Sequence, residues 1–124
     1  MEQGNATLLV VDDDSVNLEI IPEDLQDDGY HIVTASDGEQ AWALLQEDPN
    51  RFDAVLLDRM MPRMDGLAVL ACMKDNPVLT LIPVILQTAA AGTLQMQAGL
   101  NAGAYYYLSK PFDKETLRAI VRAA

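Results

Sequence analysis

The segment TLLVVDDD, residues 7–14, changes abruptly from five apolar or β-branched residues to three aspartates. A second segment, AVLLD at residues 54–58, ends in the same way with Asp58. Short aliphatic runs of this kind are typical of buried strands in a parallel sheet, and ligands of such sheets bind beyond the carboxyl ends of the strands. The two segments therefore predict strand ends that bring Asp12, Asp13 and Asp58 into one crevice.

A cluster of carboxylates requires compensating positive charge. Like charges at short range repel each other, and a cation that prefers oxygen ligands offsets them, so Mg²⁺ is the first candidate. Two further strand ends supply complementary groups, because residues 83–87 lead into Thr88 and residues 104–108 lead into Ser109 and Lys110. A hydroxyl, an ammonium group and a metal around one carboxylate suit phosphoryl transfer.

Length and composition indicate one globular domain over residues 1–124, with 50% hydrophobic residues. The net charge of -11 disfavours direct binding to nucleic acid or to an anionic membrane. A single cysteine, Cys72, leaves no internal disulfide, and no apolar run approaches the length of a membrane span. These features predict a cytoplasmic protein.

Apolar segments alternate with segments in which apolar residues recur at helical spacing. Strands are predicted at about residues 7–11, 31–35, 53–57, 83–87 and 104–108. Such alternation favours an α/β fold, a five-stranded parallel doubly wound sheet of flavodoxin-like order 2-1-3-4-5 with helices on both faces. In this order the ligand crevice lies between the first and third strands, where the aspartates are.

Four motifs of the chain resemble the receiver domain of bacterial two-component response regulators. They are VVDDD at residues 10–14, DAVLLDRMMP at 53–62 followed by MDG at 64–66, QTA at 87–89, and GAYYYLSKPF at 103–112. Each motif alone is a weak signal. All four in this order, over nearly the whole chain, identify it as a member of that family.

The resemblance implies that Asp58 accepts a phosphoryl group from the phosphohistidine of a sensor histidine kinase or phosphotransfer protein. Asp13, Asp58 and the backbone carbonyl of Met60 would hold Mg²⁺, and Asp12 would act through a bound water. The domain would assist its own phosphorylation and dephosphorylation without being an enzyme. Asp14 is expected to face solvent or to cap the first helix.

Further roles follow from the same resemblance. Thr88 and Lys110 would bind the phosphoryl group, and Tyr107 would be the switch aromatic. Phosphorylation would then alter the surface of the fourth helix, fifth strand and fifth helix, which an output domain or a downstream protein reads. Met60 and Ala90, two positions after Asp58 and Thr88, would border the path of the hydrolytic water and predict slow loss of the phosphoryl group.

Other interpretations of these residues remain open. Asp12 and Asp13 are also suitable helix-capping residues. DDDSV at residues 12–16 also satisfies the Asp-x-Asp-x-Val motif of haloacid-dehalogenase-like phosphatases, with Asp12 as nucleophile and Asp14 as general acid, although that leaves Asp58 unexplained. A pseudo-receiver that serves only as a protein-interaction module is the third possibility. A dinucleotide-binding domain is excluded, because no Gly-x-Gly-x-x-Gly follows a strand.

Two features depart from the receiver pattern. Pro22 falls inside the first helical segment, where it removes a backbone donor and predicts a kink. Tyr105 and Tyr106 make the edge near the fifth strand unusually aromatic, which suggests a partner surface there. No output segment follows Ala124 in this sequence, so we expect either a stand-alone domain or one cut from a larger regulator.

Overall fold

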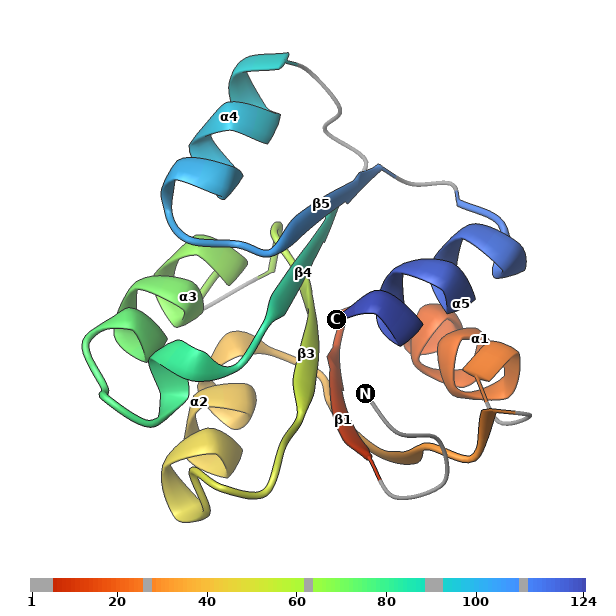
Figure 1. Cartoon of the computed structure of the whole chain (residues 1–124), viewed down its shortest axis with the longest axis horizontal. Coiled ribbons are helices and arrows are strands. Elements are labelled where there is room, and N and C mark those ends of the chain that lie inside the picture. The colour runs from red at the N-terminus through yellow and green to blue at the C-terminus, as the bar shows by residue number, and fades with distance from the viewer. Residues whose placement is uncertain (1–5, 26–27, 62–63, 89–92, 110–111) are drawn as a thin grey trace.

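The computed structural model describes residues 6–25, 28–61, 64–88, 93–109 and 112–124 (Figure 1). The strands are β1 (Thr7–Val11), β2 (His31–Ala35), β3 (Ala54–Asp58), β4 (Val84–Thr88) and β5 (Tyr106–Ser109). The helices are α1 (Ser15–Leu25), α2 (Gly38–Glu47), α3 (Gly66–Lys74), α4 (Thr93–Asn101) and α5 (Lys114–Ala123), with a short 3-10 helix, η2 (Leu79–Leu81).

The strands form one parallel sheet in the order β2-β1-β3-β4-β5, which confirms the predicted topology. Helices α1 and α5 cover one face of the sheet, and α2, α3 and α4 lie on the other (Figure 1). Strands β3, β4 and β5 begin and end one or two residues later than predicted. The order in which the strands are added to the sheet reverses between β1 and β3, and the carboxyl ends of these two strands lie side by side.

Alternation along the strands divides the core into two layers. In β3, Val55 and Leu57 belong to the layer under α2 and α3, whereas Ala54 and Leu56 belong to the layer under α1 and α5. All five residues of β3 are buried, as expected for the central strand of a sheet covered on both faces. Burial on both sides holds the end of β3 in a fixed position.

Aspartates determine where three of the helices begin. The side chains of Asp37, Asp65 and Asp113 each accept a hydrogen bond from the backbone N–H three residues later, at 2.8, 2.9 and 2.7 Å. Caps of this kind stabilise a helix by about 1 kcal/mol each. Three of the 19 acidic residues therefore cap helices and take no part in the predicted crevice.

Helix α1 continues through Pro22 to Leu25, so the proline does not end the helix. The short helix η2 before β4 was not expected from the sequence. Within the described residues, no helix is both long enough and apolar enough to cross a membrane.

Candidate functional site

The carboxyl ends of β1 and β3 bring three carboxylates together. One oxygen from each of Asp12, Asp13 and Asp58 lies within 4.8 Å of the others. Asp12 and Asp58 are buried, whereas Asp13 is exposed at the rim of the cluster. The predicted convergence of these side chains is confirmed.

Asp12 is held by bonds to both of its carboxylate oxygens. Oδ1 accepts from the backbone N–H of Asp14 at 2.9 Å, and Oδ2 accepts from the Nδ2 of Asn17 at 3.2 Å. Its own N–H donates to the carbonyl of Ala35 on β2 at 3.1 Å, which extends the sheet by one residue. Asn17, in the first turn of α1, was not singled out from the sequence, because only the fold brings it back to Asp12.

Asp14 has a different position from its two neighbours. It is exposed, its carboxylate accepts from the N–H of Val16 at 2.9 Å, and its carbonyl accepts from the N–H of Leu18 at 3.2 Å. These are the bonds of a helix N-cap. Asp14 therefore both caps α1 and faces solvent, in agreement with the expectation for this residue.

Asp58 ends β3 with its side chain only 4% exposed. Its Oδ1 accepts from the N–H of Met60 at 3.3 Å, while the side chain of Met60 is 62% exposed. The start of α3 lies against the same backbone, because the N–H of Gly66 donates to the carbonyl of Arg59 at 3.0 Å. A Cβ at Gly66 would lie 2.5 Å from the backbone oxygen of Asp58, so only glycine permits this approach.

Thr88 and Tyr107 lie on the face of the sheet that α3 and α4 cover. Thr88 ends β4 and is 1% exposed, and Tyr107 of β5 is 4% exposed and paired with Leu86 of β4. The ring of Tyr107 lies against Gly99 of α4, where an added Cβ would be 2.7 Å from the ring carbon Cδ2. The described structure thus has the predicted switch aromatic turned inward. Lys110 and Ala90 lie outside the described residues.

The donor set fits a hard divalent cation. Carboxylate and carbonyl oxygens are the ligands that Mg²⁺ prefers, and one exposed carboxylate at the rim leaves room for the several waters that this ion retains. Three carboxylates at this spacing also repel each other unless a cation or shared protons intervene.

The model of the family described as the response regulator receiver domain matches residues 8–122. The chain belongs to this family. It is 41% identical over 119 residues to the response regulator PleD of Caulobacter vibrioides. This alignment covers 96% of this chain and 26% of PleD. It is 43% identical over 116 residues to the response regulator MprA of Mycolicibacterium vanbaalenii, covering 94% of this chain and 48% of MprA.

The chain thus spans between about a quarter and a half of the length of these curated relatives, and the single-domain prediction for the whole protein stays a prediction. Receiver domains are phosphoacceptor signalling domains and in general not enzymes. This assigns the chain to two-component signal transduction.

Solved receiver structures have the same fold. The Francisella response regulator 1452 receiver domain superimposes with a TM-score of 0.87 at 31% identity. The superposition covers 96% of this chain and 95% of the Francisella chain. The receiver domain of the sensor histidine kinase PA1611 from Pseudomonas aeruginosa superimposes with a TM-score of 0.85 at 30% identity, with 95% of each chain covered. That structure has a magnesium ion coordinated in its active site cleft.

Proposed function

We propose that Asp58 accepts a phosphoryl group from the phosphohistidine of a sensor histidine kinase or phosphotransfer protein. The convergence of Asp12, Asp13 and Asp58 within 4.8 Å, in a receiver fold, is the observation that carries this proposal. Of the three, Asp58 is the one that belongs to a strand, and all five residues of that strand are buried. A nucleophile gains from such positioning because the reacting atoms must be aligned.

In this transfer, a carboxylate oxygen of Asp58 forms a bond to phosphorus while the bond from phosphorus to the donor imidazole breaks. The imidazole nitrogen keeps the electron pair of the broken bond. Asp13, Asp58 and the carbonyl of Met60 are the proposed ligands of Mg²⁺, with Asp12 acting through water. When bound, the ion would offset the negative charge of both reactants.

Thr88 and Lys110 are the proposed phosphoryl-binding residues. Thr88 lies at the carboxyl edge of β4, the strand beside β3, so its hydroxyl starts from the same edge of the sheet as Asp58. Lys110 follows β5 at that edge in the sequence and would supply positive charge. The phosphatase alternative, with Asp12 as nucleophile, is disfavoured because the chain belongs to the receiver family and because that alternative leaves Asp58 unexplained.

Phosphorylation is proposed to act on a surface formed by α4, β5 and α5. Tyr107 connects this surface to Thr88, because both side chains lie on the same face of adjacent strands. Leu100, Tyr105 and Tyr106 are between 44% and 49% exposed and offer apolar contact area to an output domain or downstream protein. The cytoplasmic location and the lack of nucleic-acid and membrane binding stay predictions from the sequence.

The test is incubation with a small phosphodonor and Mg²⁺, followed by intact mass measurement. We expect one phosphoryl adduct on the parent and none on Asp58→Asn. Asp75→Asn is the matched control, since Asp75 is an exposed aspartate at the end of α3, and it should form the adduct normally. An Asp58→Asn variant that is modified like the parent would overturn the proposal, as would a parent that forms no adduct, which is the outcome for a pseudo-receiver.

A further inference from the structure

Strand β4 carries a buried polar side chain that the site described above does not use. Gln87 is 0% exposed, and within the described part of the chain neither its Oε1 nor its Nε2 has a hydrogen-bond partner. The three residues before it, Val84, Ile85 and Leu86, are apolar and buried. A buried donor or acceptor without a partner costs about 1–3 kcal/mol, so an apolar residue at position 87 would give a more stable strand.

The sheet register places Gln87 beside the phosphoacceptor. Gln87 and Asp58 are partners in the parallel pair of β4 and β3, so their side chains leave the same face of the sheet. Adjacent strands are about 4.8 Å apart, and glutamine is one methylene longer than aspartate, so the amide extends farther from the sheet than the Asp58 carboxylate, toward the place of a group attached to that carboxylate. On its other side, Gln87 pairs with the apolar Leu108 of β5.

The order of the strands also separates Gln87 from the acidic residues that follow β1. Along the carboxyl edge of the sheet, Asp12 follows β1, Asp58 ends β3, and Gln87 lies on β4. The carboxylates of Asp12 and Asp13 therefore lie on one flank of Asp58, and Gln87 lies on the opposite flank. A cation belongs among the three carboxylates, whereas an amide N–H on the far flank is suited to an anionic oxygen.

We propose that Gln87 is a phosphoryl-binding residue, whose Nε2–H donates a hydrogen bond to an oxygen of the phosphoryl group carried by Asp58. This inference rests on the proposed function of Asp58. It accounts for a polar residue that destabilises the unmodified protein, because phosphorylation supplies the partner that the amide lacks. A hydrogen bond to a charged oxygen is about twice as strong as one between neutral groups.

Two measurements on Gln87→Met test this assignment. Methionine has a similar length and fills the same space without polar atoms, so the variant is expected to fold. In chelator, where no cation is bound, its thermal midpoint should lie above that of the parent. Its affinity for beryllofluoride, a phosphoryl mimic, should be about tenfold weaker at saturating Mg²⁺, as expected from one lost hydrogen bond to a charged group.

Gln46→Met is the matched control, because Gln46 is an exposed glutamine on α2, and it should change neither quantity. Beryllofluoride affinity equal to that of the parent, or a lower midpoint in chelator, would overturn the role of Gln87. In either case, phosphorylation of Asp58 in both proteins would leave the proposed function intact. A parent that binds no beryllofluoride and forms no adduct would remove both proposals.

Discussion

At the residue scale, the central feature is a set of carboxylates that the fold holds against their mutual repulsion. Asp13 is exposed and lies near Asp12 and Asp58, both buried. Because Asp13 is a proposed Mg²⁺ ligand, Asp13→Ala should abolish Mg²⁺ binding in a calorimetric titration. In chelator the same variant should melt at a higher temperature than the parent, because the repulsion is relieved.

Asp14→Ala is the control for this variant. Asp14 caps α1 through the N–H of Val16, so its loss should lower the free energy of unfolding by about 1 kcal/mol and leave the Mg²⁺ affinity unchanged. Unchanged Mg²⁺ affinity in Asp13→Ala, or a lower melting point in chelator, would argue against the acidic cluster as a cation site.

Met60 is the residue through which we expect phosphoryl lifetime to be set. Its side chain is 62% exposed beside Asp58, and an apolar chain there cannot orient a hydrolytic water. We predict a long-lived phosphoprotein, and a shorter lifetime in Met60→Asn combined with Ala90→Glu, by about tenfold for each 1.4 kcal/mol of regained positioning. Intact mass followed over time measures this, with Met60→Leu as an apolar control. Equal lifetimes of the double variant and the parent would show that these positions do not gate the water.

Gly99 determines whether the ring of Tyr107 can lie inward. A methyl group at this position would lie 2.7 Å from Tyr107 Cδ2 and 3.0 Å from Leu86 Cδ1. Gly99→Ala should therefore displace the ring toward solvent, while the gain of up to about 1 kcal/mol in helix propensity offsets much of the packing loss. We expect changed NMR signals for the Tyr107 ring, identified with Tyr107→Phe, at nearly unchanged stability. Ring signals identical to those of the parent would contradict the contact.

Site residues that directly follow an apolar run could be predicted from the sequence. Residues whose role depends on a contact between a helix and a strand end could not. Asp12, Asp13 and Asp58 could be found because acidic residues directly follow apolar runs. Asn17 and Gly66 could not be assigned roles, because their partners are determined by how α1 and α3 turn back onto the strand ends.

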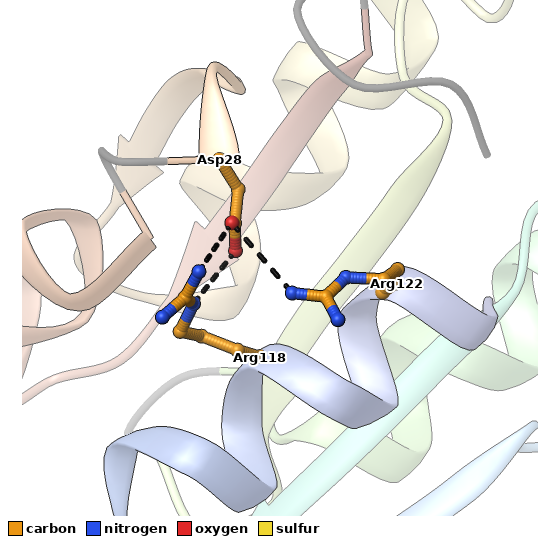
Figure 2. A network of polar contacts seen from close by, with 3 residues as sticks. All are labelled: Asp28, Arg118 and Arg122. Carbon is orange, nitrogen blue, oxygen red and sulfur yellow. Dashed lines mark hydrogen bonds and ion pairs between the residues drawn. The ribbon is translucent and has the colours of Figure 1, made fainter.

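At the scale of elements, α5 is tied to the segment before β2 by a buried carboxylate. Asp28 accepts from Arg118 Nε at 3.0 Å and from Arg118 Nη2 at 2.7 Å, and Arg122 lies at 3.7 Å (Figure 2). The hydrogen bond from Arg118, together with the positive charges of Arg118 and Arg122, holds the pKa of Asp28 below its ordinary value. Asp28 and Arg118 are 90 positions apart in the sequence, and so no local pattern could have predicted the contact.

Loss of Arg118 should therefore cost stability in a pH-dependent way. The side chain of Asp28 is 3% exposed, so Arg118→Met leaves a buried carboxylate without its bidentate partner and should cost about 2 kcal/mol at pH 7. Because the pKa of Asp28 is lowered in the folded state, the Asp28–Arg118 pair contributes its full stabilisation when the pH is above the pKa of Asp28 in the unfolded chain, about 3.9. This stabilisation is lost as the pH falls through the pKa of Asp28 in the folded protein. Urea unfolding of parent and variant should show a difference at pH 7 that shrinks below pH of about 4.

Arg122→Met is the control, since Arg122 is half exposed and makes only the longer contact, and it should cost less than about 1 kcal/mol. A difference between the parent and Arg118→Met that stays constant down to the acid range would mean that the pair contributes through packing and not through charge.

At the scale of the whole molecule, the sheet order follows from the alternation of strands and helices, and it was predicted correctly. Right-handed crossovers and coverage of both faces leave few arrangements of five parallel strands. The first and last residues of β5 were harder to predict from the sequence, because three successive tyrosines are compatible with several strand registers. The pairing with β4 decides which register is adopted. The same topology places Asp58 between Asp12 and Asp13, which follow β1, and Gln87 of β4.

The most direct test of this account is the position of the phosphoryl group in the phosphorylated protein. Borohydride reduces an acyl phosphate of aspartate to homoserine, which peptide mass spectrometry locates. We predict homoserine at position 58, with Asp12 and Asp13 unmodified. Homoserine at position 12, or at any position other than 58, would contradict the assignment of Asp58 as the phosphoacceptor.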